Sequence, residues 1–472
     1  MVFSSNVFLI LFLPIFLICY FACPKKWSNI VLLLFSIVFY AYGAPTFVLL
    51  LIASTIINFY LVKLSYKADN QLRRKVYSGL AIAVSLGLLL YFKYANFFVD
   101  NLNAILAAFG LKTVGFAKVL LPIGISFFTF QSITYVVDAY RRVNQPMEKL
   151  TDYMLYILMF PQLIAGPIVR YGDIADEIRH REKHWPEILQ GFYRFVIGLS
   201  KKILIADVIG EQVNTLLSGD LLVMDTGTAW IAILAYTMQL YFDFSGYSDM
   251  AIGLGKMLGF HFPENFDNPY NSASISEFWR RWHITLGTFM RNYLYIPLGG
   301  NRCSKPRMYF NLWVVFLLSG FWHGANWNFV LWGVYHGFWL VLERMGLSKF
   351  YEKIGRVPSV VITFILVTVG WAIFRIENLT DCFTFISRLF AFDFQSFVPV
   401  RNAHFHTTLI VALIFSFLTL FPFGKKLQNL VFYTELSKIQ HLAGWIVSVV
   451  LFLFCLGALN AGAFSPFIYF RF

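Results

Sequence analysis

Long apolar runs follow one another along most of the chain, separated by short polar and basic segments. A helix needs about 17 to 25 mainly apolar residues to cross a bilayer. The runs that approach or exceed this length lie at about residues 6–22, 28–43, 46–64, 77–97, 119–139, 188–208, 228–248, 308–324, 327–345, 358–376, 405–423 and 443–461. The pattern predicts an all-α polytopic membrane protein with about 11 to 12 transmembrane helices.

Two stretches interrupt this pattern and are predicted to enter the membrane without crossing it. The segment "QLIAGPIVR" (162–170) is a short apolar hairpin broken by a Gly-Pro pair. Residues 264–301 begin with polar Asn-Pro turn chemistry and continue into an apolar part that is too short to cross. Irregular backbone is tolerated at membrane depth only where protein or a cavity covers it. We therefore predict re-entrant or interfacial segments, with a helix in 264–301 that Ser274 or Ser276 caps.

Composition indicates one membrane-embedded domain over residues 1–472. Hydrophobic residues make up 58% of the chain and charged residues 13%, whereas about 25% of the residues in soluble domains are charged. We find neither a low-complexity tail nor a repeat of short period. The polar stretch 170–187 is predicted to be an amphipathic interfacial helix that Pro186 ends.

The basic residues lie mostly in the short loops between runs, and this predicts the orientation of the chain. The net charge is +13, but the positive-inside rule and anionic lipid account for it better than nucleic acid does. The first run has no basic residue before it and two lysines, Lys25 and Lys26, after it. It is therefore interpreted as a span and not as a cleaved signal peptide, with the N-terminus outside.

No metal site is predicted. The chain has five cysteines, and none of them forms a CxxC pair or another metal-binding spacing. His404 and His406 have no carboxylate or cysteine nearby in the sequence, so we assign them to solvent or lipid headgroups.

Two of the apolar runs carry polar residues in helical register. Ionisable groups in hydrocarbon are costly, so each one that persists suggests a function. The rows are Gln131, Tyr135 and Asp138 in the first run, and Gln239, Asp243 and Tyr247 in the second. Each row forms one helix face that points inward. The rows either line a passage filled by water or substrate or join helices by hydrogen bonds, with Gly246 allowing two backbones to approach.

Arginines gather around the stretch 264–301. They include Arg280, Arg281, Arg291 and Arg302. This cationic cytoplasmic mouth suits the phosphates of a donor molecule, although lipid headgroups would satisfy the same charges.

Three histidines stand among aromatic residues. His323 lies in "SGFWHGANW", His283 follows "SEFWRRW", and His336 comes thirteen residues after His323. On one unbroken helix, His323 and His336 would lie about 20 Å apart at 1.5 Å per residue, so a shared site requires a break at residues 324–326. A desolvated imidazole stays neutral and can accept a proton from an alcohol. His323 is thus a general base, a nucleophile or a buried structural donor, and His336 is interpreted as packing or as a residue that supports the site from behind.

Five motifs, in their order and spacing, resemble the membrane-bound O-acyltransferase (MBOAT) family. They are "FPQLIAGPIVRY", "DFSGYSDMAIGLGKMLGF", "NPYNSASISEFWRRWHITL", "NYLYIPLGGNR" and "SGFWHGANWNFVLWGVYHG". They fall within residues 120–345, the predicted core. The resemblance is stronger to the bacterial branch that acts in alginate O-acetylation than to the D-alanyl transfer proteins of teichoic acid synthesis.

This resemblance implies a helical bundle with a tunnel through the bacterial cytoplasmic membrane. It assigns the family's essential histidine to His323 and the second histidine to His283. It also implies acetyl-CoA as a cytoplasmic acyl donor, with no bound cofactor, and an extracytoplasmic acetyltransferase partner that modifies a polysaccharide such as alginate, cellulose or peptidoglycan.

Acyl transfer through such a site needs a base and a group that stabilises the oxyanion. We predict that His323 takes the proton of the acceptor hydroxyl and that His283 positions the thioester or the ring of His323. The candidates for stabilising the oxyanion or positioning the substrate are Asn326, Trp322, Trp327 and Trp282.

Other functions remain open from the sequence. D-alanyl transfer from a carrier-protein thioester to teichoic acid is one, and a transporter for an anionic glycan or lipid is another, since intramembrane aspartates suit a transport path. A scaffold of a secretion complex is the third, and it predicts that loss of the histidines has no effect.

Overall fold

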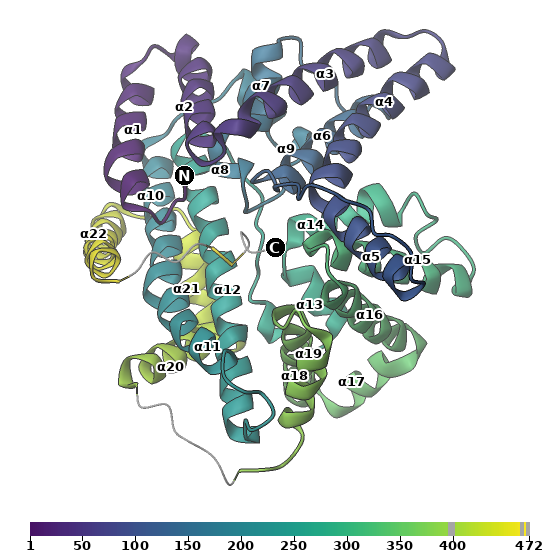
Figure 1. Ribbon diagram of the computed structural model, residues 1–472. Helices are drawn as coiled ribbons and strands as arrows, with labels where there is room; N and C mark the ends of the chain where they lie inside the picture. The colour runs from purple at the N-terminus through teal and green to yellow at the C-terminus, as the bar shows by residue number, and fades with distance from the viewer. Residues whose placement is uncertain (395–401, 463–466, 469–472) are drawn as a thin grey trace. The chain divides into compact units, whose positions relative to one another are not determined.

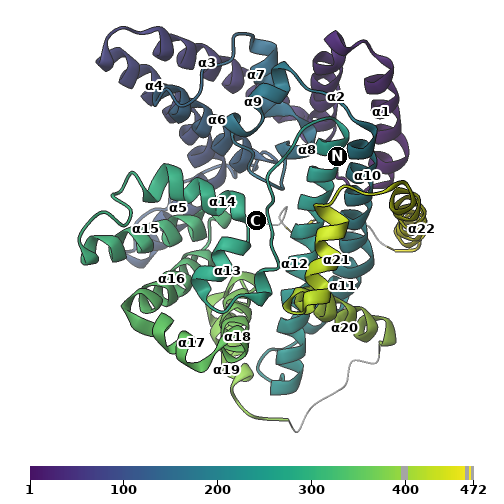
Figure 2. The same cartoon turned by 180° about the vertical axis from the view of Figure 1, so that it is seen from behind.

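The computed structural model describes residues 1–394, 402–462 and 467–468, which divide into two compact units (Figures 1 and 2). Unit 1 comprises residues 1–183 and 259–263, and unit 2 comprises residues 184–258 and the described part of 264–472. Over the described ranges the regular structure is helical, without a strand, and an isolated antiparallel bridge joins Phe266 to Trp282. The all-α prediction is confirmed, and the single domain predicted for 1–472 stays a prediction.

Unit 1 is built from short helices and longer apolar ones. Its α-helices are α1 (Leu13–Ala22), α2 (Ser28–Gly43), α3 (Val48–Lys67), α4 (Gln71–Leu89), α5 (Ala95–Ala108), α6 (Ile125–Tyr140), α7 (Leu150–Leu158), α8 (Phe160–Leu163) and α9 (Tyr171–Arg179), with 3-10 or π-helical turns η1 (Val7–Phe12), η2 (Lys25–Trp27), η3 (Pro45–Phe47) and η4 (Leu90–Tyr94). Helices α3 and α4 lie side by side (Figures 1 and 2). Asn58 donates to Ser85 at 2.9 Å between them, so buried polar groups pair across helices, as expected in a membrane interior.

Unit 2 contains the longest helix and the histidines of interest. Its α-helices are α10 (Trp185–Ser200), α11 (Val208–Leu217), α12 (Thr226–Met257), α13 (Ile275–Arg281), α14 (Ile284–Phe289), α15 (Lys305–His323), α16 (Trp327–Leu342), α17 (Ser348–Ile354), α18 (Arg356–Arg375), α19 (Leu379–Leu389), α20 (Ala403–Phe417), α21 (Pro422–Phe432) and α22 (Lys438–Ala461). The 3-10 or π-helical turns are η5 (Lys201–Asp207), η6 (Pro269–Asn271), η7 (Met290–Tyr295), η8 (Glu343–Leu347) and η9 (Leu418–Leu420).

Glycines bring α10 and α12 into close contact along their length. A Cβ atom on Gly246 would lie 2.8 Å from the carbonyl oxygen of Gly198, and one on Gly191 would lie 2.7 Å from that of Gly253. Any larger residue at these positions would push the two backbones apart. The close backbone approach predicted at Gly246 is therefore confirmed, and α12 is the buried central helix of unit 2 (Figure 1).

The described residues include six helical stretches that are long and apolar enough to cross a membrane. They are Lys25–Gly43, Pro45–Lys67, Gln71–Ala108, Arg356–Arg375, Ala403–Leu420 and Lys438–Ala461, and a shorter apolar helix covers Val7–Ala22. Several other apolar runs form helices that are shorter or richer in charge. The run predicted at 119–139, for example, becomes helical only at Ile125, because Gly124 before it adopts a left-handed conformation with φ 77°.

The structure corrects one predicted helix boundary. Pro186 does not end the helix at 170–187: α9 ends earlier, at Arg179, and Pro186 lies in the first turn of α10. A proline there costs no hydrogen bond, because the first N–H groups of a helix have no intrahelical partner.

The stretch 162–170 contains no continuous helix, since α8 ends at Leu163 and the backbone beyond it is irregular.

Candidate active site

The segment that follows α12 is anchored so that α13 starts at a fixed position. Ser274, one of the two caps predicted from the sequence, caps α13 by accepting a hydrogen bond from the N–H of Glu277 at 3.0 Å. Glu343, which is buried, accepts from the N–H groups of Ile275 at 2.6 Å and Ser276 at 2.9 Å. A carboxylate at a helix N-terminus satisfies free N–H groups and complements the helix dipole.

His283 lies between α13 and α14 in a left-handed conformation, with φ 47° and ψ 54°. Contacts with residues 265 and 266 hold it there. The N–H of Ile284 donates to the carbonyl of Asn265 at 2.9 Å, and Phe266 forms an antiparallel bridge with Trp282. Its ring is 1% exposed, and its Nδ1 lies 3.0 Å from Oδ1 of Asn265. Burial of this ring favours the neutral imidazole over the charged form.

His323 is the last residue of α15, and a change of chain direction encloses its ring. Gly324 is extended and Asn326 caps α16, so the two helices are separate. The break anticipated at residues 324–326 therefore exists. The ring of His323 packs against Trp332 of α16 at a centroid distance of 5.1 Å and against Phe374 of α18 at 5.2 Å.

The indole of Trp322 connects the two histidines. Its ring centroid lies 4.8 Å from that of His323 and 6.1 Å from that of His283, and all three side chains are buried. The structure thus brings together residues that lie forty positions apart in the chain. Their catalytic roles stay predictions.

His336 extends the same aromatic cluster. Its ring lies 4.9 Å from that of Trp332, and its Nδ1 accepts a hydrogen bond from Nε1 of Trp279 at 3.4 Å. His323 and His336 therefore both contact Trp332. The surroundings of His336 agree with its interpretation as a packing residue.

The four candidates for oxyanion stabilisation lie in different surroundings. Trp322 is the one placed beside both histidines. The side-chain oxygen of Asn326 accepts from the N–H of Trp327 at 2.6 Å, so it serves as a helix cap, and Trp327 is half exposed. Trp282 packs in the core at 4.8 Å from Trp371.

The two predicted polar rows are buried on separate units. In unit 1, Gln131, Tyr135 and Asp138 lie on α6; in unit 2, Gln239, Asp243 and Tyr247 lie on α12.

Contacts of Asp243 and Tyr135, one residue from each row, join helices and loops. Asp243 forms an ion pair with Lys202 at 2.6 Å and accepts from the N–H of Ile468 at 2.9 Å. The hydroxyl of Tyr135 accepts from the N–H of Met147 at 3.1 Å. Such bonds support the packing alternative, and the tunnel-lining role stays a prediction.

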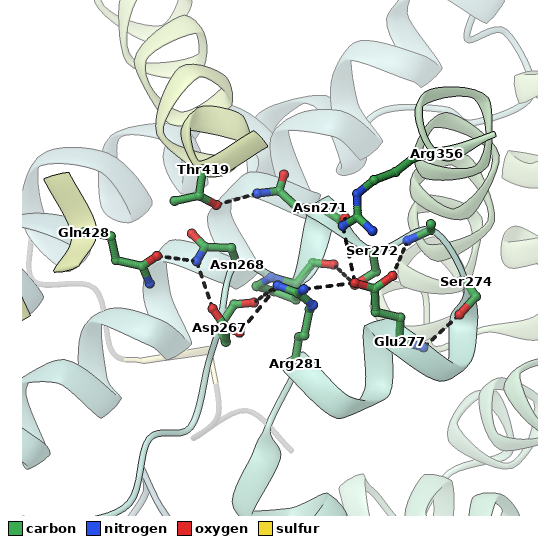
Figure 3. Close-up of polar contacts among 12 residues, drawn as sticks. Asp267, Asn268, Asn271, Ser272, Ser274, Glu277, Arg281, Arg356, Thr419 and Gln428 are labelled. Atoms are coloured by element: carbon green, nitrogen blue, oxygen red, sulfur yellow. Dashed lines mark hydrogen bonds and ion pairs between the residues drawn. The ribbon is translucent and has the colours of Figure 1, made fainter. Parts of the chain in front are cut away.

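The four arginines of the predicted cationic mouth differ in their surroundings, and the mouth stays a prediction. Arg280, Arg291 and Arg302 are exposed, whereas Arg281 forms ion pairs with Glu277 at 3.0 Å and Asp267 at 3.4 Å (Figure 3). A polar hollow of about 270 Å³ lies beside this cluster. Its lining includes Asp267, Asn271, Arg281, Arg356 and Lys425.

Glu277 is the acidic centre of the cluster in Figure 3. Burial opposes its ionisation, but the N–H of Ala273 and the guanidinium groups of Arg281 and Arg356 hold its pKa below 4.5. Arg356 and Lys425, which both line the polar hollow, were not predicted as members of the cationic mouth. Both flank apolar runs far from 264–301, and only the fold places them there.

A larger cavity of about 620 Å³ lies in unit 2 next to the α10–α12 contact. Its lining includes Arg194, Lys201, Asp249, Glu264 and Asn265. Asp249 accepts from Lys201 at 2.6 Å and from Arg194 at 2.9 Å, so the charges compensate one another. Nothing in the sequence analysis pointed to the partners of Asp249 or to Asn265.

Within the ranges that the structure describes, no group of three or more His, Cys, Asp or Glu side chains is arranged to hold a metal ion.

Comparison with known proteins gives consistent matches over most of the chain. A model of the membrane-bound O-acyltransferase family matches residues 37–374. The "Probable alginate O-acetylase AlgI" of Azotobacter vinelandii is 41% identical over 501 residues, covering 100% of both chains. The protein of the same name from Pseudomonas aeruginosa is 44% identical over 90% of this chain and 81% of its own length. The "Peptidoglycan O-acetyltransferase" of Helicobacter pylori is 35% identical over 80% of this chain and 78% of its own.

Proposed function

The chain belongs to the membrane-bound O-acyltransferase family, and we propose that it transfers an acetyl group from cytoplasmic acetyl-CoA towards an extracytoplasmic polysaccharide. The names of its relatives suggest alginate or peptidoglycan as the final acceptor. A carrier-protein thioester is the alternative donor, and cellulose is the alternative acceptor. The experiment described below distinguishes both alternatives from the proposal.

The observation that carries this proposal is the placement of His283 and His323 on one indole, that of Trp322. Both imidazoles are enclosed by aromatic rings, and they come from separate segments, since His283 lies between α13 and α14 and His323 ends α15. Burial favours the neutral form of an imidazole, and a neutral ring nitrogen can take a proton without a metal. Excluding water also protects a thioester from hydrolysis.

The transfer follows from these positions. His323 accepts the proton of the acceptor hydroxyl as its oxygen attacks the thioester carbonyl. The Nε1–H of Trp322 is the candidate to stabilise the oxyanion, because Trp322 is the predicted donor that contacts both histidines. The new C–O bond forms, the C–S bond breaks, and His323 returns the proton to the thiolate, which leaves as the free thiol.

We place this site in a through-membrane tunnel of a bundle of about 11 to 12 spans in the bacterial cytoplasmic membrane. The N-terminus lies outside, as the basic loops indicate. The acetyl group then passes to an extracytoplasmic acetyltransferase partner, which modifies the polysaccharide.

The test uses the full chain in proteoliposomes with radiolabelled acetyl-CoA on one face. The lumen holds alginate oligosaccharides, peptidoglycan fragments or cellulose oligosaccharides together with the extracytoplasmic acetyltransferase. We expect free CoA thiol to appear on the donor side and label to appear in the luminal acceptor. Parallel vesicles supplied with an acetylated carrier protein identify the donor.

The critical variant is His323→Ala, with His180→Ala as its control, because His180 is an exposed histidine of unit 1. The proposal predicts loss of thiol release and of label transfer in the first variant and wild-type rates in the second. Thiol release that survives His323→Ala in folded protein contradicts it. A transporter would instead move intact acetylated molecules without releasing thiol.

A further inference from the structure

We propose that Asn265 is a positioning residue that fixes both the tautomer and the orientation of His283. This inference rests on the proposed function, because it concerns how His283 is prepared for acyl transfer. Asn265 and His283 are 0% and 1% exposed, and Nδ1 of the imidazole lies 3.0 Å from the amide oxygen Oδ1. Water therefore does not compete for this bond.

Neighbouring groups determine which end of the amide faces the ring. The backbone N–H of Thr285 can only donate, and it points at Oδ1 of Asn265 at 3.4 Å. The hydroxyl of Thr285 donates to the same atom at 2.8 Å. At the other end, Nδ2 of Asn265 donates to the hydroxyl of Ser248 at 3.0 Å. The atom that faces His283 is therefore the carbonyl oxygen.

This orientation assigns the proton of the imidazole. A carbonyl oxygen only accepts, so Nδ1 of His283 must carry the hydrogen. In a neutral ring, Nε2 then holds the lone pair. Nε2 forms no hydrogen bond with a described residue, although this atom is buried. The lone pair is thus free to accept a proton or a hydrogen bond from a substrate.

The backbone and the packing fix the direction of this lone pair. Asn265 accepts the N–H of Ile284 with its own carbonyl at 2.9 Å, so its main chain and its side chain both hold the histidine. Phe244 packs edge to face on the ring at 4.8 Å and Trp322 lies at 6.1 Å. A ring that turned over about the Cβ–Cγ bond would place the carbon Cδ2 where Nδ1 lies and lose the bond to Asn265.

Enzyme kinetics can separate positioning from simple packing. Asn265→Ala removes the acceptor, and we expect kcat to fall about 10- to 100-fold, as for other groups that orient a functional imidazole. Asn265→Asp keeps an acceptor opposite Nδ1 and adds a negative charge that favours the imidazolium. We expect it to restore part of kcat and to move the acidic limb of the pH profile of kcat/KM to higher pH.

Asn311 supplies a matched control. It is also a fully buried asparagine of unit 2, and its Nδ2 donates to the carbonyl of Leu298 at 3.2 Å. We expect Asn311→Ala to leave the pH profile in place even where it lowers the melting temperature. An acidic limb that stays in place in Asn265→Asp contradicts the proposal, as does a kcat of Asn265→Ala that is unchanged.

A spectroscopic measurement makes the test independent of activity. The ring nitrogens of ¹⁵N-histidine-labelled protein in lipid bilayers are recorded, and His283 is assigned by subtracting the spectrum of His283→Gln. We expect a protonated Nδ1 and a bare Nε2 in the wild type and a mixture of tautomers in Asn265→Ala. A protonated Nε2 in the wild type overturns the proposal. If His283→Gln transfers acetyl groups at the wild-type rate, the role of His283 in the proposed function fails instead, while the spectra still decide the role of Asn265.

Discussion

His323 and Trp332 meet edge to face, with their ring planes at 83° and their centroids 5.1 Å apart. Trp332 is fully buried and also contacts His336 and Phe374. The position of the His323 ring therefore depends on one large side chain that belongs to the next helix. Any change in that side chain reaches the proposed reaction centre directly.

Trp332→Ala should damage both stability and transfer. Truncating a buried tryptophan costs about 3 to 5 kcal/mol, and a misplaced His323 is expected to lower kcat about 100-fold. Trp332→Phe keeps an aromatic ring and should retain most of the rate. Thermal unfolding in detergent and acetyl transfer in proteoliposomes measure the two effects. Trp445→Ala on α22, where the indole is half exposed, is the control, and equal losses in both variants would refute a specific role for Trp332.

Local signals in the sequence were sufficient for several features around this site. Glycine and asparagine at 324–326 predicted a possible break between His323 and His336, because such residues end and cap helices. Serine at 274 or 276 predicted a cap for the same reason, and the structure shows that Ser274 is the cap. The five motifs identified the family correctly, since each combines several residues at fixed spacing.

Other features depend on contacts that no local pattern encodes. Asn265 and His283 are eighteen residues apart, and they meet because Asn268 and His283 both adopt left-handed backbone conformations. The Asn-Pro pair at 268–269 predicted a turn, and asparagine and histidine adopt this conformation more often than most residues other than glycine. Neither signal indicates that Asn265 meets His283. The misassigned role of Pro186 has a similar cause, because proline marks the first turn of a helix as readily as the point beyond its end.

The glycine contacts between α10 and α12 predict a strong size limit. Gly198→Ala and Gly246→Ala each place a methyl group against the facing backbone, and we expect a loss of about 1 to 3 kcal/mol. Gly87→Ala on α4 is the control, because a Cβ there meets no atom within 4 Å. That variant should gain about 0.4 to 1 kcal/mol, since alanine reduces the freedom of the unfolded chain. Melting temperatures that fall equally in all three variants would contradict the close contact.

The buried ion pair of Lys202 and Asp243 predicts an unequal response to its two halves. Lys202 contacts both Asp243 and Asp207, at 2.6 and 2.7 Å. Lys202→Met leaves the carboxylate of Asp243 buried without its cation, which costs about 3 to 5 kcal/mol. Asp243→Asn should cost less, because Lys202 keeps Asp207.

The double variant Lys202→Met/Asp243→Asn should recover part of the loss, because it removes both buried charges. Denaturation in detergent micelles gives the free energies of unfolding of the wild type, the two single variants and the double variant, and the double-mutant cycle compares them. Additive losses would show that the two residues do not interact.

Glu277 predicts how stability depends on acidity. Burial raises the cost of its charge, but Ala273, Arg281 and Arg356 hold its folded pKa below the ordinary value of 4.5. A carboxylate of this kind stabilises the fold fully above its unfolded pKa, and the contribution is lost as the pH falls through the folded pKa. Glu277→Gln lacks this contribution, so the wild type should melt at a higher temperature than the variant above pH 4.5. The difference should shrink as the pH falls below that value.

Asp176→Asn, at a side chain that is 99% exposed, serves as the control. Melting curves in detergent from neutral to acidic pH decide the matter: a gap between wild type and Glu277→Gln that is independent of pH would mean that the network in Figure 3 does not depend on the charge of Glu277.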